Sequence, residues 1–151
     1  MTAEFAVAVH ALVYLEHVGT LTPSGVLADN ICTNPARVRK VMARLHHAGL
    51  VEAREGKNSG YCTLPGAAAI TLRQVIEALG EEPVSSHWRS GDVDRACQIC
   101  SGMAAVMDDI YARMNEDCIR TLSGITIGAI TAQLVPNATA GKKENKPNGE
   151  S

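Results

Sequence analysis

Two proline-marked helix starts near the N-terminus constrain the fold of this chain more than any other feature of its sequence. Thr22-Pro23 and Asn34-Pro35 each combine a side-chain oxygen that can cap a helix with a proline at the first helical position. Their close succession predicts two short helices, over residues 23–30 and 35–48, joined by a tight turn. Apolar residues at helical spacing predict a further helix ahead of them, over residues 3–18.

A glycine-rich hairpin is expected after these three helices. Residues 50–54 and 61–64 are predicted to be strands, because residues 55–60 between them hold the Gly and Asn residues that a tight hairpin requires. Three helices followed by a two-stranded hairpin is the element order of the winged helix-turn-helix. The fold class is therefore predicted to be mainly α with a small β-hairpin wing. Residues 1–80, which end in a short helix capped by Thr71, form the predicted DNA-binding domain.

The remainder of the chain is predicted to divide into a loop, two helices and a tail. Residues 81–100 are mainly polar and are expected to form a loop that holds two of the five cysteines. Residues 101–134 are expected to contain a long amphipathic helix, which Gly124 ends, and a short terminal helix. Residues 135–151 are almost free of large apolar side chains and are predicted to be a disordered tail.

The long helix carries apolar residues at a heptad-like spacing along one side. A single winged domain has no surface to cover such a stripe, so the stripe predicts a homodimer. Pairing would place two DNA-binding domains on successive half-sites of a DNA duplex. The predicted interface residues are Met107, Ile110, Met114 and Cys118.

Charge is distributed unevenly along a chain whose net charge is −2. Residues 34–57 hold six basic and two acidic side chains, a local charge of +4, whereas residues 77–94 carry a charge of −4. A basic helix can enter the major groove of DNA while a basic wing contacts the flanking phosphates, so this local charge points to double-stranded DNA as the partner. The predicted DNA-contacting residues are Asn34, Ala36, Arg37, Arg39, Lys40, Arg44, Arg54, Lys57 and Asn58.

Other patterns exclude several classes of function. No apolar run reaches the ~18–20 residues of a membrane span and no secretion leader follows Met1, so the chain is expected to be cytoplasmic. The five cysteines are expected to be reduced, with Cys32 and Cys62 packed as small apolar residues. No Ser-His-Asp set, phosphate loop or motif of paired carboxylates indicates an enzyme.

The main candidates for a redox-active or metal-binding site are Cys97 and Cys100, which form a C-x-x-C motif ahead of the long helix. The motif is compatible with inert thiols, with a reversible disulfide that makes the protein redox-responsive, or with half of a tetrahedral metal site. The absence of a second C-x-x-C excludes a zinc ribbon within one chain. If the pair reacts, Cys100 is expected to be the attacking thiolate, because it lies closer to the positive end of the helix, and Cys97 the resolving thiol.

Several segments together resemble a known family of regulators. They are AVHALVYL at residues 8–15, NPARVRK at residues 34–40, AGLV at residues 48–51, GKNSGY at residues 56–61 and ITL at residues 70–72. In this order the segments are similar to the Rrf-type winged helix-turn-helix transcription regulators, the family of IscR, NsrR and CymR. The Asn-Pro start of the third helix is most similar to the YwnA-like branch. The resemblance implies a dimer formed through the long helix and regulation of nearby promoters, with a repressor expected here.

The resemblance also implies a sensor. Several members of the family hold an iron–sulfur cluster with three cysteines in the loop before the dimer helix, whereas this loop contains only Cys97 and Cys100. Cys118 lies further along the helix and is expected to belong to the dimer seam. His10 matches a position at which a relative uses histidine as a ligand, and a half-buried helix histidine is the alternative. The candidate ligands for an iron–sulfur cluster or another metal are therefore Cys97, Cys100 and His10.

Two functions of other classes compete with a dimeric DNA-binding regulator. A thiol oxidoreductase would use Cys97 and Cys100, but the sequence lacks the βαβ pattern that usually frames such a motif. A winged helix can also serve protein–protein interaction without binding DNA. Steep salt dependence of binding to a promoter fragment distinguishes the DNA-binding function, because neutralising phosphates releases counterions.

Overall fold

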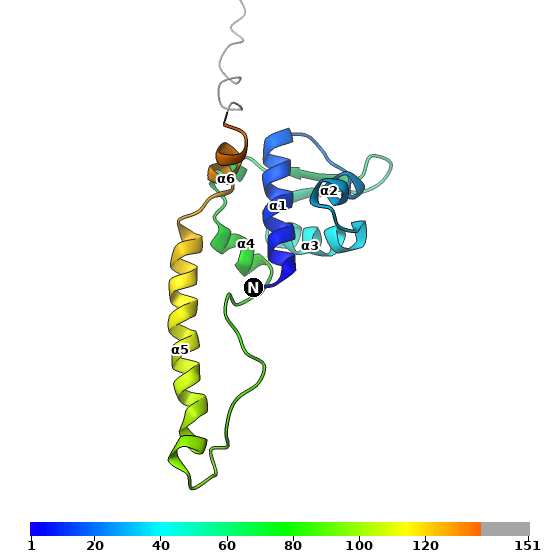
Figure 1. Cartoon of the computed structure of the whole chain (residues 1–151). Coiled ribbons are helices and arrows are strands. Elements are labelled where there is room, and N and C mark those ends of the chain that lie inside the picture. Colours follow the sequence, from blue (N-terminus) through cyan, green and yellow to red (C-terminus); the bar gives the residue numbers. More distant parts are fainter. Residues whose placement is uncertain (137–151) are drawn as a thin grey trace, which may run out of the picture.

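The structure of the chain, a computed structural model, describes residues 1–136. They form a helical head and one long helix that projects from it (Figure 1). The elements in chain order are α1 (Ala3–Val18), α2 (Ser24–Ile31), α3 (Pro35–His47), β1 (Val51–Arg54), β2 (Gly60–Thr63), the 3-10 helix η1 (Ala67–Ala69), α4 (Leu72–Ala78), α5 (Gln98–Ser123) and α6 (Ile127–Leu134). The predicted disordered tail lies almost wholly outside the described residues.

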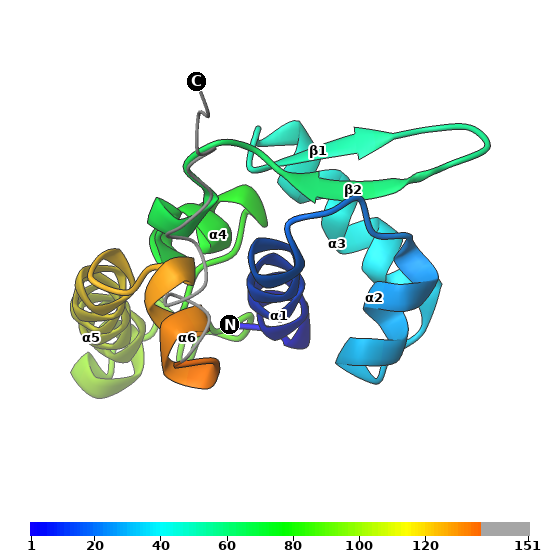
Figure 2. The same cartoon turned by 90° about the horizontal axis from the view of Figure 1, so that it is seen from above.

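The predicted fold class is confirmed. Helices dominate, and β1 and β2 form an antiparallel hairpin in which Val51 pairs with Thr63 and Arg54 with Gly60. Seen from above, the hairpin extends past α2 and α3, while α5 and α6 lie on the other side of α1 (Figure 2). No helix among residues 1–136 is long and apolar enough to span a membrane.

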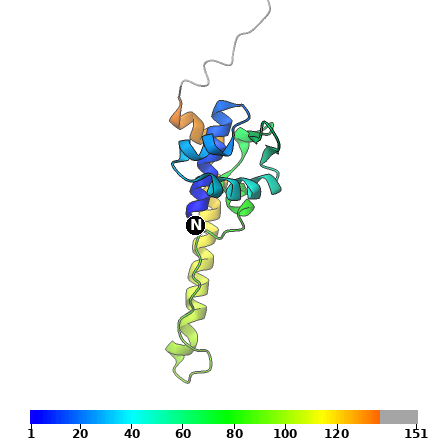
Figure 3. The same cartoon turned by 90° about the vertical axis from the view of Figure 1, so that its right-hand side faces the viewer.

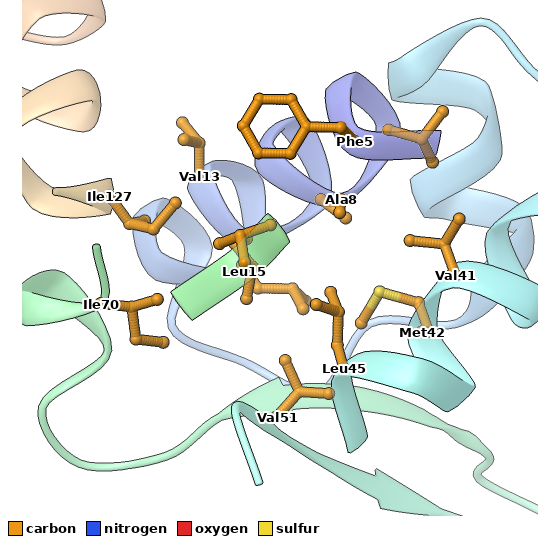
Figure 4. Packing of buried hydrophobic residues seen from close by; sticks show 14 of the residues in the cluster. Phe5, Ala8, Val13, Leu15, Val41, Met42, Leu45, Val51, Ile70 and Ile127 are labelled. Atoms are coloured by element: carbon orange, nitrogen blue, oxygen red, sulfur yellow. The ribbon is translucent and has the colours of Figure 1, made fainter. Parts of the chain in front are cut away.

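Helix α1 lies at the centre of the head. It packs most extensively against α6 and α3, and α2, α4 and β2 also contact it. Leu12 and Leu15 of α1, Leu45 of α3 and Ile127 of α6 are almost completely buried, and Figure 4 shows side chains of this cluster converging between the helices and the hairpin. Burying one aliphatic side chain of this size contributes about 1.5–3 kcal/mol, so the cluster sets the relative positions of α1, α3 and α6.

Two helix starts that the sequence predicts are confirmed. The Asn34 Oδ1 atom accepts a hydrogen bond from the backbone N–H of Arg37 at 2.8 Å, and Pro35 is the first residue of α3. Thr71 and Gln74 form a reciprocal capping box at the start of α4. These caps fix where α3 and α4 begin, because each satisfies backbone N–H groups that have no partner within the helix.

The start of α2 differs from the prediction. Thr22 does not cap this helix, because its hydroxyl donates to the carbonyl of Thr20 and its backbone forms an antiparallel bridge with Tyr61 of β2. The two N–O distances of this bridge are 2.8 and 2.9 Å. Helix α2 begins at Ser24 without a side-chain cap, and Val26, expected on its inner face, is exposed. The bridge attaches the wing to the start of α2.

Helix α5 begins at Gln98, earlier than the predicted start at residue 101. Cys97 is therefore the N-cap residue, and Cys100 lies in the first turn of the helix rather than in the loop. The C-terminal part of α5 packs on the head through the buried Leu122, and the rest of the helix projects away (Figure 3). Because the first turn of a helix has free backbone N–H groups, the shifted start changes the surroundings of both thiols.

The loop over residues 81–97 runs beside α5, and polar contacts attach it there (Figure 1). The side-chain amide of Asn115 on α5 donates to the backbone carbonyl of Val84 and accepts from its N–H, at 2.8 Å each. Nearer the tip, Arg89 forms an ion pair with Asp108 of α5. This loop and α5 together are called the arm below.

Helix α6 returns the chain to the head. The backbone N–H of Leu72 donates to the carbonyl of Ile125, and that of Ile127 donates to the carbonyl of Ile70, at 2.9 Å each. This short bridge joins the start of α4 to the turn between α5 and α6. Helix α6 then packs along α1 (Figure 2), so the root of the arm is anchored in the head.

Replacing Gly60 by alanine tests the contact between the wing and α2. A Cβ atom at Gly60 would lie 2.7 Å from the carbonyl oxygen of Thr22, too close for the bridge to remain undistorted. We expect Gly60→Ala to lower the free energy of unfolding in urea by about 1–3 kcal/mol, the usual cost of overpacking. Gly25→Ala is the matched control, because nothing lies within 4 Å of the added carbon and alanine favours a helix. Equal stability of the two variants would contradict the bridge.

Candidate nucleic-acid interface

Helix α3 presents one face to the core and the opposite face to solvent. Its inner stripe is completely buried, as the sequence predicts, and consists of Val38, Val41, Met42 and Leu45. The outer face is exposed and consists of Ala36, Lys40, Ala43 and His47. The two alanines keep this face thin, so the helix backbone can approach a double-stranded ligand closely.

The first turn of α3 lies at the exposed end of the helix. The Oδ1 atom of Asn34 is used by the helix cap, so only the rest of its amide group faces solvent. Arg37 is exposed and lies between the outer face of α3 and the start of α1, where it lines a small cavity together with Glu4. Because helix N-termini carry a partial positive charge, the turn combines one cationic side chain with a favourable site for an anion.

A cleft of about 410 Å³ separates α3 from the wing. Arg39 of α3, Arg54 of β1, Tyr61 of β2 and Ser24 at the start of α2 contribute to its lining. The Nη1 atom of Arg39 lies 3.5 Å from the hydroxyl oxygen of Ser24. Two guanidinium groups beside a hydroxyl form a set of donors suited to an anion such as phosphate.

The exposed side chains of the wing carry both signs of charge, with Glu52 and Glu55 as the acidic ones. Arg54, Lys57 and Asn58 all face solvent, and the turn that carries the last two projects furthest from the head (Figure 2). The Nε atom of Arg54 lies 3.8 Å from a carboxylate oxygen of Glu52. An ion pair this exposed contributes little, so Arg54 keeps most of its capacity to attract phosphate.

Two predicted DNA-contacting residues also contact the core of the head. The Nζ atom of Lys40 lies 2.7 Å from one carboxylate oxygen of Glu4, and Nη1 of Arg44 lies 3.3 Å from the other. Arg44 also donates to the carbonyl of Leu79 at 3.1 Å. The hydrogen bond from Lys40 and the nearby positive charges lower the pKa of Glu4 against the opposing effect of burial. Arg44 therefore docks α3 onto α1 and α4, and Lys40 is shared between this contact and the outer face.

Four residues of this surface are absent from the sequence prediction: Ser24, Tyr61, Ala43 and His47. The last two follow Ala36 and Lys40 at a spacing of seven residues, so helical periodicity contained the signal for them. Ser24 joins the surface only because α2 is packed across α3, and no pattern near Ser24 in the sequence shows this packing.

The two cysteines of the C-x-x-C motif have different surroundings. Cys97 is exposed at the N-cap of α5, whereas Cys100 is half-buried in the first turn. The free backbone N–H groups of Cys100 and Ile99 lower the pKa of the Cys97 thiol, which forms no capping hydrogen bond with them. These surroundings differ from the expected ones: because α5 starts earlier than predicted, Cys97 rather than Cys100 lies beside the free N–H groups of the helix.

The other cysteines lie outside the arm tip. Cys32 ends α2 in the left-handed conformation with a φ of 60°, and its thiol is exposed, so the prediction that it packs as a small apolar residue is wrong. The backbone turn after α2 places this side chain on the outside. Cys62 is half-buried on β2, where burial and the neighbouring Glu52 carboxylate raise the pKa of its thiol. Cys118 is half-buried on α5.

The candidate metal ligands do not come together within one chain. Among residues 1–136, no three His, Cys, Asp or Glu side chains are placed to hold one metal ion. His10 is exposed on α1, where its Nε2 atom lies 2.8 Å from Oδ1 of Asn30. Cys97 and Cys100 lie instead at the tip of the arm, far from the head (Figure 1). The side chains of residues 1–136 of one chain therefore do not fit an iron–sulfur cluster or another metal centre.

The residues predicted to form a dimer interface differ in how much of each side chain is exposed. Ile110 and Met114 are 43% and 46% exposed, whereas Met107 and Cys118 are half-buried. Further exposed apolar residues extend the row of Ile110 and Met114 toward the start of the helix. The complete row, called the α5 stripe, is Ile99, Met103, Val106, Ile110 and Met114.

Comparisons with known proteins identify the family. The family model described as "Rrf2: Iron-dependent Transcriptional regulator" matches residues 1–133. No curated protein sequence matches the chain. Among solved structures, the chain is similar to a candidate transcriptional regulator from Lactobacillus plantarum, with 23% sequence identity and a TM-score of 0.77. The match covers 93% of this chain and 95% of that chain.

Two other solved structures share the fold. CymR (YrzC), described as the global cysteine regulator of B. subtilis, is 16% identical, with a TM-score of 0.64 and coverage of 88% of this chain and 96% of that chain. T. potens IscR is also 16% identical, with a TM-score of 0.65 and coverage of 96% and 93%. The assignment to the YwnA-like branch stays a prediction. Because the family model spans nearly all of the described residues, the chain belongs to the Rrf2 family of winged-helix transcriptional regulators.

Proposed function

We propose that this protein is a transcription regulator that binds double-stranded DNA through α3 and the wing. The observation that carries the proposal is the thin, exposed outer face of α3 beside a cleft lined by Arg39 and Arg54. Such a helix fits the major groove, and the wing then lies over the neighbouring phosphates. Arg37 and Lys40 are the proposed contacts to base edges. A regulator seated on a promoter blocks access to it, so we propose repression as the effect.

The separation of charge along the chain supports this surface. The basic residues 34–57 build α3 and the wing, and the acidic residues 77–94 belong mostly to the loop of the arm. Most of the loop runs beside α5, away from the wing (Figure 1), and only its first residue, Glu81, lines the same cavity as Arg37. DNA that approaches α3 therefore meets a local positive charge, although the net charge of the chain is −2.

Two substitutions separate base recognition from phosphate contact. Duplexes that the parent protein selects from a random library provide the specific ligand, and an unrelated duplex provides the nonspecific one. Arg37→Ala should weaken binding of the selected duplex by about 1–3 kcal/mol and leave the unrelated duplex nearly unchanged. Lys57→Ala should weaken binding of both duplexes and reduce the salt slope by about one unit, because one phosphate contact is lost.

Arg73→Ala is the matched control for these variants. It removes the same charge from α4, where Arg73 pairs with Glu77 outside the proposed surface. In gel shifts at two salt concentrations, Arg73→Ala should bind both duplexes with the same affinity as the parent protein. If Arg37→Ala and Lys57→Ala also bind both duplexes like the parent, α3 and the wing do not form the DNA surface.

We also propose that the protein is a homodimer in which a second copy covers the α5 stripe. Five apolar side chains remain exposed along a helix that projects from the head (Figure 3). A second apolar surface, a groove of about 500 Å³, lies between α1 and α6 and is lined by side chains such as Phe5, Val9 and Leu134. A twofold arrangement would bury both surfaces at once, because each copy supplies one stripe and one groove.

Ile110→Asp should convert dimers into monomers, because an unpaired carboxylate is costly in an apolar interface. Ala105→Asp introduces the same charge at an exposed position outside the stripe and should leave the dimer intact. Light scattering at micromolar concentration gives the masses, and circular dichroism checks the fold of each variant. Affinity for the selected duplex should fall only with Ile110→Asp, since its two heads no longer bind together. The proposed dimer would be wrong if the parent protein is a monomer, or if Ile110→Asp stays dimeric like its control.

We further propose that the C-x-x-C motif makes the regulator responsive to its redox environment. Cys97 and Cys100 lie where the loop joins the N-terminus of α5, the helix through which two copies would associate. A new bond between these thiols would change the geometry of the arm and, with it, the spacing of the two heads. Placement on the arm of a regulator favours this role over enzymatic thiol exchange. The ligands of one chain give no support to a metal-responsive role.

A further inference from the structure

Two thiols lie one helical turn apart at the start of α5. Cys97 is the N-cap residue, and Cys100 is the third residue of the helix. Side chains three positions apart on a helix are neighbours, with Cβ atoms about 5–6 Å apart. A disulfide requires Cα atoms about 4.4–6.8 Å apart, a separation that one helical turn provides. A bond between these two sulfurs also requires the Cβ atoms to approach to about 3.5–4.5 Å, so the first turn must adjust locally to form it.

The two thiols differ in their access to solvent. Cys97 is exposed, and the free N–H groups of Ile99 and Cys100 stabilise negative charge on its sulfur. Cys100 is half-buried, and the loop closes over it: the Asp92 N–H donates to the Cys100 carbonyl at 3.0 Å. Gly91 packs so closely on that carbonyl oxygen that a Cβ atom would overlap it. An incoming reagent therefore reaches Cys97 first.

One of the two carboxylates near the motif, that of Asp92, has partners within the loop. Asp92 accepts a hydrogen bond from the backbone N–H of Asp94 at 3.0 Å, and its other oxygen lies 3.8 Å from Nε of Arg95. These contacts orient the Asp92 carboxylate within the loop. The free N–H groups at the start of the helix favour negative charge on the exposed sulfur.

We propose that Cys97 is the attack site for small-molecule disulfides and that Cys100 is the resolving thiol. In the first step the Cys97 thiolate attacks one sulfur of the small disulfide, a mixed disulfide forms, and one small thiolate leaves. In the second step the Cys100 thiol loses its proton to solvent and attacks the Cys97 sulfur, which expels the second small thiolate. Each chain is oxidised by two electrons to a Cys97–Cys100 disulfide, and one small disulfide is reduced to two thiols.

The product disulfide would stiffen the tip of the arm. It fixes Cys97 against the first turn of α5, while the hydrogen bond from Asp92 to the Cys100 carbonyl holds the loop on the other side of that turn. The loop and the helix would then move as one body. An effect on DNA binding rests on the proposed function, whereas the exchange chemistry does not depend on it.

Oxidised glutathione is the probe that tests the order of attack. The reduced full-length protein is mixed with it, and peptide mass spectrometry follows each cysteine with time. In the parent, a Cys97–Cys100 disulfide should accumulate with the release of two thiols per disulfide formed. In Cys100→Ser the reaction should stop at a mixed disulfide on Cys97, whereas the motif in Cys97→Ser should react at least about tenfold more slowly. Cys32, exposed but outside the motif, is the internal reference thiol in every sample.

Three outcomes would overturn the proposal. They are modification of Cys100 before Cys97, a Cys97→Ser variant whose motif reacts at the parental rate, and a mixed disulfide that persists in the parent protein. Circular dichroism confirms that both variants fold. If the variants do not fold, the order of attack is decided by the parent protein alone, from the rates at which Cys97 and Cys100 are modified.

Binding of the selected duplex is measured separately for the reduced, the oxidised and the Cys97→Ser/Cys100→Ser proteins. Failure of all three to bind any duplex would refute the proposed function and leave the exchange chemistry standing. Equal binding by all three would refute only a regulatory effect of the disulfide. A change in affinity of the oxidised protein alone supports both the chemistry and its regulatory effect.

Discussion

The burial of α1 is the interaction on which the rest of the structure depends. Its Leu12 and Leu15 side chains are almost inaccessible to solvent, and α3, α4 and α6 all pack on this one helix. Because α1 covers the inner stripe of α3, the outer face of α3 must point to solvent. Because α1 also holds α6, the turn that precedes α6 is fixed, and the direction of α5 follows from it. One core therefore positions both the basic surface and the arm.

Local sequence patterns predicted the parts of the fold that depend on near neighbours. Asn34 caps α3 through an N–H group only three residues away, and Thr71 caps α4 in the same way. The start of α2 could not be predicted from such patterns, because Thr22 is paired with Tyr61, a residue that comes close only after the chain has folded. A cap and a bridge compete for the same residue, and only the tertiary structure decides between them.

The composition of the candidate site was easier to predict than its geometry. Basic charge indicated α3 and the wing, yet charge alone could not show that Glu4 and the Leu79 carbonyl hold Arg44 against the head. A small error at a helix end also has a large chemical consequence. Helix ends are hard to predict because the last turns are only weakly stabilised, and here the start of α5 decides whether Cys97 or Cys100 lies beside free N–H groups.

The length of α5 determines how far a small tilt at one end of the helix displaces its other end. Its 26 residues span about 39 Å at the usual helical rise of about 1.5 Å per residue. One end is anchored by Leu122 and by the backbone bridge between Leu72 and Ile125, and the other end carries Cys97. For a lever of this length, a tilt of about 5° at one end displaces the other by about 3 Å. That displacement is comparable with the rise of one base pair of DNA, about 3.4 Å, so in the proposed dimer a small rotation of this helix would shift the two heads relative to each other by about one base-pair step.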